Sequence, residues 1–229
     1  MSKGLFIVGT DTDVGKTYVT ALLTKRLRES GVNVGYYKAV LSGGYYDGDE
    51  LIPGDAKEVL ETSGIDENYD ECVSYILENP VSPHLAAQIE AVDIQLSKVL
   101  EDYQNLTKRY EYLSVEGSGG IICPIKLTET ESILLEDIIR LLDIPTLVVA
   151  RAGLGTINHT ALTINYLRQK EIPIQGIILN GYDMDNVVHK NNKKVIERLT
   201  NIKVIATIPT GNLQEEIDID VDHLIELYK

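Results

Sequence analysis

The chain has 229 residues, of which 44% are hydrophobic and 24% are charged, a balance typical of a globular protein that buries a full core. Its formal net charge of −14 disfavours nucleic acid and anionic membrane surfaces as partners, because both carry negative phosphate groups. The apolar stretches, such as 144–150, are too short to cross a bilayer, and Cys72 and Cys123 lack metal-ligand spacing, so we expect a cytoplasmic protein with free thiols.

Short apolar runs alternate along the chain with longer segments of helical periodicity. The predicted strands are residues 5–8, 32–40, 112–115, 146–150, 174–179 and 204–208. The predicted helices are residues 16–30, 55–62, 93–106, 131–142, 157–170 and 186–199. Most of the strands are continuously apolar, as strands covered by helices on both faces are. We therefore predict a single α/β domain over residues 1–229, with a doubly wound, mainly parallel sheet that binds ligands beyond the carboxyl ends of its strands.

A glycine-rich loop, GTDTDVGKT at residues 9–17, follows the first predicted strand and opens the first helix. It is a P-loop with one residue more between its glycines than the common spacing. Glycines let successive backbone N–H groups turn toward an anion, and the helix adds its positive N-terminus. Lys16 can reach the β- and γ-phosphates of a nucleotide, and the Thr17 hydroxyl can bind Mg²⁺. The loop predicts a P-loop NTPase-like fold and a nucleoside triphosphate, ATP or GTP, as ligand.

Charged residues near the ends of other predicted strands extend this candidate site. Lys38 could stabilise charge on a transferring phosphoryl group, or it could be solvated surface. Glu116 ends a buried strand and precedes the glycines of 117–120, which favours a carboxylate linked to Mg²⁺ over a turn residue. Asp55 opens a predicted helix, where it could be an N-cap or a second carboxylate at the metal.

Four further features have two interpretations each. Asp11 and Asp13 either point outward as turn formers or lie near a metal and a cationic partner. Asn180 could read an adenine edge or form a turn. Residues 153–159 open a helix whose free N–H groups could hold a carboxylate, and a simple helix start is equally consistent. His159 is interpreted as a packing or hydrogen-bonding residue rather than a base. The tyrosines near the second strand are interpreted as compositional habit rather than as a cofactor site: Tyr36, Tyr37, Tyr45 and Tyr46.

Taken in chain order, these motifs resemble those of the dethiobiotin synthetase family. They are residues 9–17, Tyr37 with Lys38, Ser42 with Gly43, Asp55, residues 82–84, residues 115–120, residues 155–159 and Asn180. The resemblance covers essentially the full chain and implies a P-loop ligase of biotin biosynthesis. In the implied reaction, 7,8-diaminononanoate takes up CO₂ as an N-carbamate, ATP phosphorylates the carbamate to a carbamic-phosphoric anhydride, and the second amine closes the ring, releasing ADP and phosphate.

The resemblance also implies a role for each matching residue. It makes Lys38 the catalytic lysine, with Lys16 and Thr12 beside it. The implied Mg²⁺ ligands are Thr17, Asp55 and Glu116. The implied ATP-binding residues are Asp13, Val14, Gly15, Lys16, Thr17, Tyr18, Asp55, Glu116, Gly117, Ser118, Gly119, Asn180, Pro209, Thr210 and Gly211. The implied residues for the diamine and its carbamate are Thr12, Lys38, Ser42, Gly155, Thr156, Ile157 and Asn158, the last four supplied by the second subunit of a homodimer.

The alternative function is that of a partition-type P-loop ATPase, a molecular switch built on the same kind of fold. Such proteins carry a signature lysine early in the P-loop, and here Asp11 stands in that place. The C-terminal residues 218–229 are acidic, unlike a membrane-docking segment. A glutamine-dependent amide synthase would need a further domain, and a binding-only protein would not need Lys16, Thr17, Asp55 and Glu116 together. The sequence therefore favours the synthetase.

Overall fold

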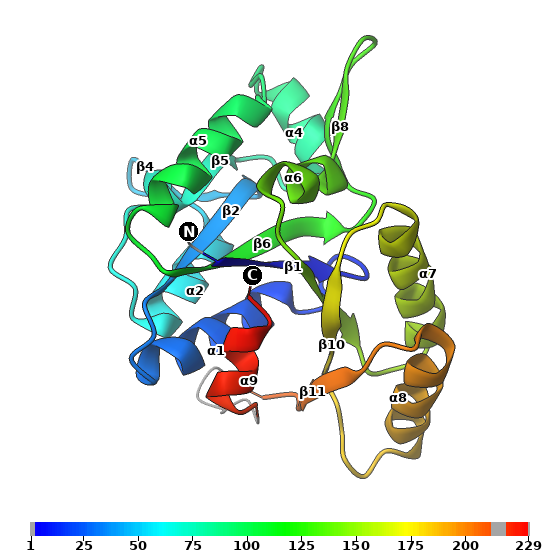
Figure 1. The fold of residues 1–229 in the computed structure, drawn as a ribbon. Coiled ribbons are helices and arrows are strands. Elements are labelled where there is room, and N and C mark those ends of the chain that lie inside the picture. Colours follow the sequence, from blue (N-terminus) through cyan, green and yellow to red (C-terminus); the bar gives the residue numbers. More distant parts are fainter. Residues whose placement is uncertain (1–2, 212–218, 229) are drawn as a thin grey trace.

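The structure is a computed structural model that describes residues 3–211 and 219–228 (Figure 1). Within these residues, seven strands form one sheet in the order β11-β10-β9-β1-β6-β2-β5, and all neighbouring strands pair in parallel. The strands are β1 (Lys3–Gly9), β2 (Val34–Ser42), β5 (Val73–Leu77), β6 (Tyr112–Gly120), β9 (Thr146–Arg151), β10 (Ile174–Asn180) and β11 (Val204–Ile208). The predicted doubly wound parallel sheet is confirmed.

Helices cover both faces of the sheet because neighbouring residues of a buried strand point to opposite sides. In β1, Phe6 and Val8 enter a core with α4, α5, α6, α7 and α8, whereas Leu5 and Ile7 enter a core with α1 and α9. Tyr36 of β2 belongs to a third core, between α1 and α2. The helices are α1 (Lys16–Glu29), α2 (Gly54–Ser63), α3 (Tyr69–Cys72), α4 (Pro83–Ile89), α5 (Leu96–Thr107), α6 (Leu135–Leu142), α7 (Thr156–Gln169), α8 (Val187–Thr200) and α9 (Val221–Glu226).

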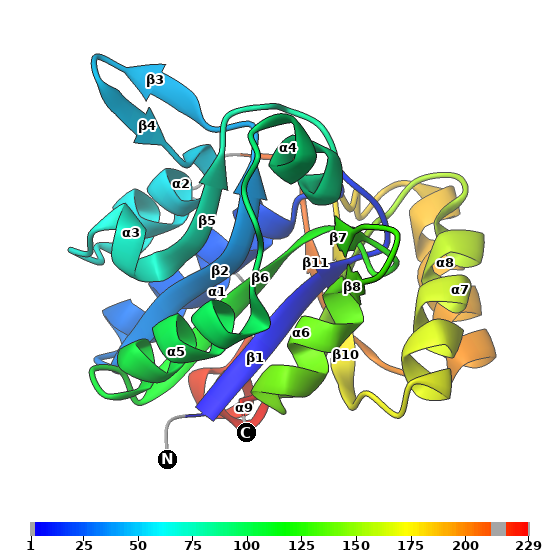
Figure 2. The same cartoon turned by 90° about the horizontal axis from the view of Figure 1, so that it is seen from above.

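Two antiparallel hairpins lie outside the main sheet. One joins β3 (Tyr45–Asp47) to β4 (Glu50–Ile52) between Ser42 and Asp55, and it projects from the body of the domain (Figure 2). The other joins β7 (Pro124–Leu127) to β8 (Ser132–Leu134). Both hairpins were absent from the sequence-based prediction, as were β5, α3, α4 and α9.

Three predicted boundaries differ from the structure by three residues or more. The predicted helix over 131–142 begins only at Leu135, where the Asp137 carboxylate accepts a hydrogen bond from the Leu134 N–H at 2.8 Å and fixes the helix start. The predicted helix over 93–106 begins at Leu96. The strand predicted to end at Glu116 continues to Gly120. The glycines let β6 pack closely, since a Cβ at Gly117 would lie 3.0 Å from the Phe6 ring.

Among the described residues, every helix is too short or too polar to cross a membrane.

Candidate active site

The loop between β1 and α1 adopts a conformation that its glycines make possible. Gly15, at the N-cap of α1, has a left-handed φ of 90°, and a Cβ there would collide with the Asn180 amide. A Cβ at Gly9 would lie 2.7 Å from the Asp11 carbonyl oxygen, the same oxygen that accepts a hydrogen bond from Lys16 Nζ at 3.2 Å. Because Gly15 has no side chain to cap α1, the first N–H groups of that helix are available to an anion.

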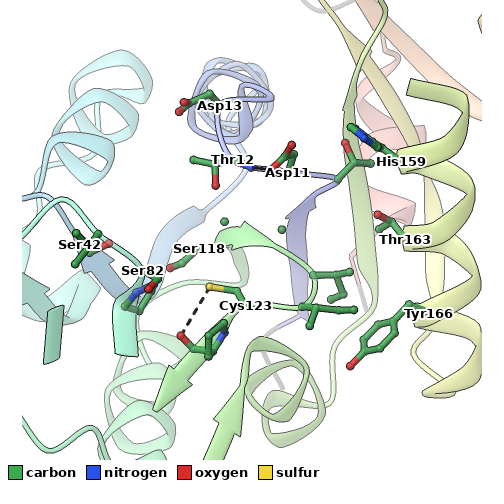
Figure 3. Close-up of a pocket in the computed structure, with 18 of the residues that line it drawn as sticks. Asp11, Thr12, Asp13, Ser42, Ser82, Ser118, Cys123, His159, Thr163 and Tyr166 are labelled. Atoms are coloured by element: carbon green, nitrogen blue, oxygen red, sulfur yellow. Dashed lines mark hydrogen bonds between the residues drawn. The ribbon is translucent and has the colours of Figure 1, made fainter. Parts of the chain in front are cut away.

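Two adjoining cavities open beside this loop. The smaller, of about 480 Å³, is lined by Thr12, Asp13, Gly15, Lys16, Thr17, Lys38, Ser42, Asp55, Glu116, Ser118 and Gly119. The larger, of about 980 Å³, shares Thr12, Asp13, Ser42, Ser118 and Gly119 with it. Figure 3 shows the larger cavity, with Thr12 and Ser118 on one side and Thr163 and Tyr166 of α7 on the other. The structure therefore brings the predicted metal residues, most of the predicted phosphate residues and three of the seven predicted diamine residues to one place.

The floor of the smaller cavity is a cluster of charges around Lys38, in which Lys38 and Glu116 are buried and Asp55 is partly exposed. Lys38 and Glu116 are 3% and 1% exposed. The Lys38 ammonium lies 2.6 Å from Asp55 Oδ2 and 2.7 Å from Glu116 Oε1. Oε1 of Glu116 also accepts a hydrogen bond from Thr17 Oγ1 at 2.9 Å, and Oε2 accepts one from the Tyr36 hydroxyl at 3.1 Å. Lys38 is thus no surface lysine, and Glu116 lies inside β6 rather than at its end.

The electrostatics of the cluster follow from burial and pairing. Burial alone lowers the pKa of the Lys38 ammonium, but Glu116 and Asp55 outweigh it and raise the pKa above its ordinary value. Burial likewise opposes ionisation of Asp55, yet Lys38 brings the pKa of Asp55 below its usual range. Burial and the charge of Lys38 lower the pKa of Lys16. Burial and the charge of Glu116 raise the pKa of Tyr36 well above its usual range, so its hydroxyl keeps its proton and donates.

The geometry decides one open interpretation, the helix cap at Asp55, and adds a contact to two others. Asp55 does not cap α2: the N-cap is Pro53, and the Asp55 carboxylate pairs with Lys38. Asn180, at the end of β10, donates from Nδ2 to the Val14 carbonyl oxygen at 3.0 Å and so ties β10 to the phosphate loop. Asp11 is exposed and lies 3.6 Å from the Arg151 guanidinium.

Other predicted residues lie outside the two cavities. Residues 155–158 form the start of α7, and the following turns of that helix line the larger cavity through His159, Leu162, Thr163 and Tyr166. Residues 209–211 follow β11 beside β10, with Thr210 near Gly181, and residues 212–218 lie outside the described part of the chain. Tyr18 and Gly117 also line neither cavity. His159, interpreted as a packing or hydrogen-bonding residue rather than a base, belongs to the cavity wall.

Sequence reasoning missed Tyr36 and the cavity wall on α7. Tyr36 precedes Lys38 by two positions, so the two side chains share one face of β2, and this alternation was the available signal. The α7 residues carry a weaker signal, since His159, Leu162, Thr163 and Tyr166 recur at the spacing of one helix face.

The parallel sheet, the glycine loop between β1 and α1 and the lysine, threonine and carboxylates behind it define a P-loop nucleotide-binding enzyme. A family model described as an AAA domain matches residues 3–216. Solved structures support the same fold: the septum site-determining protein MinD of Pyrococcus horikoshii has a TM-score of 0.56 at 18% identity over 92% of this chain and 82% of that one. A ParA family ATPase from Chlorobium tepidum has a TM-score of 0.56 at 16% identity over 99% of this chain and 90% of that one. Identities this low show the fold alone.

Sequence relatives are far more similar. A Clostridium perfringens protein named ATP-dependent dethiobiotin synthetase BioD is 48% identical over 220 residues, which cover 96% of this chain and 96% of the relative. A protein of the same name from Clostridium novyi is 51% identical over 91% of this chain and 88% of the relative. Another from Brachyspira hyodysenteriae is 46% identical over 93% of this chain and 95% of the relative. The chain belongs to the ATP-dependent dethiobiotin synthetase family.

Proposed function

We propose that the protein catalyses the ATP- and Mg²⁺-dependent ring-closing carboxylation of 7,8-diaminononanoate with CO₂, which yields dethiobiotin, ADP and phosphate. The observation that carries the proposal is the pair of adjoining cavities. One is built on a P-loop with Lys16, Lys38, Asp55 and Glu116, and the other is large enough for a nine-carbon diamine. The names of the curated relatives support the same activity.

The chemistry requires positioning and charge neutralisation rather than a nucleophilic side chain. One amine of the substrate adds to CO₂ and loses a proton, which gives the carbamate. A carbamate oxygen then attacks the γ-phosphorus while the bond to ADP breaks. Finally the second amine attacks the carbonyl carbon and expels phosphate. The two cavities share Thr12, Ser42 and Ser118, which would hold the carbamate where it faces the nucleotide.

The phosphate loop supports the nucleotide half of this arrangement. The first N–H groups of α1 and the Lys16 ammonium would hold the phosphates, with the backbone of Asp13, Val14 and Gly15 around them. The base would lie toward Asn180, which contacts the loop at Val14, and toward residues 209–211, of which Thr210 lies near Gly181.

The residues around Thr17 fit Mg²⁺, because a hydroxyl and two carboxylates are the oxygen ligands that this ion prefers. Thr17 Oγ1 and Glu116 Oε1 are 2.9 Å apart. The Lys38 ammonium, which contacts the same Glu116 oxygen, also contacts the Asp55 carboxylate. Mg²⁺ bound there would neutralise charge on the β- and γ-phosphates. Lys38 would then stabilise the charge of the carbamate and of the transferring phosphoryl group.

The start of α7 supports a homodimer as the working form. Residues 155–158 line neither of the two cavities described above, yet a helix start of this kind is suited to the substrate carboxylate. Leu154 beside them is 92% exposed, as an interface residue is in an isolated subunit. We infer that this segment completes the diamine site of a second subunit.

The test is ADP release by the purified protein with ATP, Mg²⁺ and bicarbonate, measured with and without 7,8-diaminononanoate. We expect strong stimulation by the diamine and a product whose mass exceeds that of the diamine by one carbonyl group less two hydrogens. ATP hydrolysis that is indifferent to the diamine would contradict the proposal and favour the partition-type ATPase.

A further inference from the structure

A buried tyrosine, for which the reaction above has no use, contacts the carboxylate at the centre of the site. The Tyr36 hydroxyl donates to Glu116 Oε2 at 3.1 Å. The other oxygen, Oε1, accepts from Thr17 Oγ1 at 2.9 Å and from Lys38 Nζ at 2.7 Å. Glu116 therefore presents one oxygen to the residues of the nucleotide site, while the hydroxyl of Tyr36 holds the other.

Packing fixes the place of this hydroxyl. Tyr36 is 1% exposed and lies in the core between α1 and α2, with Ala21, Ala56 and Val59 among its members. Its strand pairs with β6 in the register Tyr36 to Ser114, which brings the ring alongside the strand that carries Glu116. A side chain enclosed in this way has little freedom to turn, so its hydroxyl is a fixed donor.

We propose that Tyr36 is a positioning residue for the metal: it holds Glu116 Oε2, so that Oε1 faces the hydroxyl of Thr17. The proposal rests on the Mg²⁺ position of the proposed function. A carboxylate held at one oxygen offers the other in a single orientation, and residues behind metal ligands typically contribute about 10- to 100-fold to metal affinity. Without the tyrosine hydroxyl, only the contacts of Oε1 with Thr17 and Lys38 orient the Glu116 carboxylate, and a metal that takes Oε1 competes with these contacts.

The test compares two substitutions that each remove one buried hydroxyl from neighbouring residues of β2. Tyr37 points to the other face of the sheet, where its hydroxyl contacts Ser74 Oγ at 2.7 Å and the Val99 carbonyl oxygen at 2.9 Å. Mn²⁺ binding is followed by electron paramagnetic resonance of the free ion, with protein in excess over ADP so that nearly all nucleotide is bound. We expect Tyr36→Phe to weaken Mn²⁺ binding about tenfold and Tyr37→Phe to leave it unchanged.

A second arm separates positioning from a general loss of stability. If Tyr36 acts through Glu116, then Tyr36→Phe in a Glu116→Gln background changes Mn²⁺ affinity by less than about twofold, because the two effects are not additive. Equal Mn²⁺ affinities for the wild type and Tyr36→Phe would overturn the proposal, and so would equal losses in Tyr36→Phe and Tyr37→Phe. Such results leave the diamine-dependent release of ADP untouched, so the failure of this proposal and that of the proposed function are distinguishable.

Discussion

Between Asp55 and Glu116 lies the ammonium group of Lys38, within 2.6 and 2.7 Å of their nearest oxygens. Distances of this size are those of charge-assisted hydrogen bonds, which are stronger than neutral ones. The same two carboxylates and Thr17 are the proposed Mg²⁺ ligands. The ammonium and a divalent cation therefore compete for the same two carboxylates. Binding of the metal would weaken the contacts of Lys38 with Asp55 and Glu116.

Replacing Lys38 with methionine should free both carboxylates. In the absence of nucleotide, we expect Lys38→Met to bind Mn²⁺ more tightly than the wild type by about tenfold or more, since one unpaired buried charge costs several kcal/mol. Dethiobiotin formation should fall by about 10²- to 10³-fold, the usual loss when one transition-state donor is removed. Paramagnetic resonance and product mass measure the two effects.

Lys16→Met is the matched control, because it removes an equal charge from the same cavity. The Lys16 ammonium contacts the Asp11 carbonyl oxygen rather than a carboxylate. The Lys16→Met substitution should therefore change Mn²⁺ affinity much less than Lys38→Met does. Equal gains in the two variants would mean that net charge alone governs metal binding, and the competition would be refuted.

Two asparagines hold the two loops that open helices at the site. Asn180 of β10 donates to the Val14 carbonyl oxygen in the phosphate loop. Asn192 of α8 is buried and donates to the carbonyl oxygens of Ala152 and Gly153, at 2.9 and 3.1 Å, in the loop before α7. Each helix start is thus fixed by an amide from a neighbouring element, and the proposed nucleotide and diamine sites have separate supports.

Removing each amide should therefore affect a different substrate. Asn180→Ala should raise KM for ATP about fivefold, equivalent to ~1 kcal/mol for one hydrogen bond, and should weaken inhibition by inorganic triphosphate, which has no base. Asn192→Ala should raise KM for the diamine and leave that for ATP unchanged. Steady-state kinetics with each substrate varied in turn measure both. An unaltered triphosphate inhibition in Asn180→Ala would show that Asn180 does not act through the loop.

Elements with a long apolar period could be predicted from the sequence, whereas short ones could not. The periodicity of α1 and α7 extends over 14 residues each, but β3, β4 and β8 have three residues each, too few to define a period. At the site, Thr17 and Glu116 stand in motifs and could be placed from the sequence. The contact of Tyr36 depends on how β2 pairs with β6, and this register is a tertiary property.

At the scale of the whole molecule, exposed leucines distinguish one region of the surface. Leu154, at the loop before α7, is 92% exposed, and Leu162 on α7 beside the larger cavity is 61% exposed. Apolar side chains gathered next to a site favour a covering partner. The proposed second subunit would bury them and bring residues 155–158 to the diamine.

Leu154→Asp should therefore prevent dimer formation and raise KM for the diamine, because a carboxylate is costly to bury without a partner. Leu199→Asp is the control, since Leu199 is 63% exposed at the far end of α8. Light scattering coupled to size-exclusion chromatography reports the mass, and nucleotide binding should be the same in both variants. A dimer that persists in Leu154→Asp would rule out this face as the interface.

The cluster around Glu116 joins parts of the chain that are distant in sequence: Thr17 is 99 positions away and Lys38 is 78. Contacts of this kind form slowly, because the chain entropy of closing long loops is lost before any gain from pairing. The cluster forms only when β2 and β6 have paired in the sheet. A partly folded chain consequently lacks a complete nucleotide site. ATP would therefore slow unfolding of the native state without speeding folding.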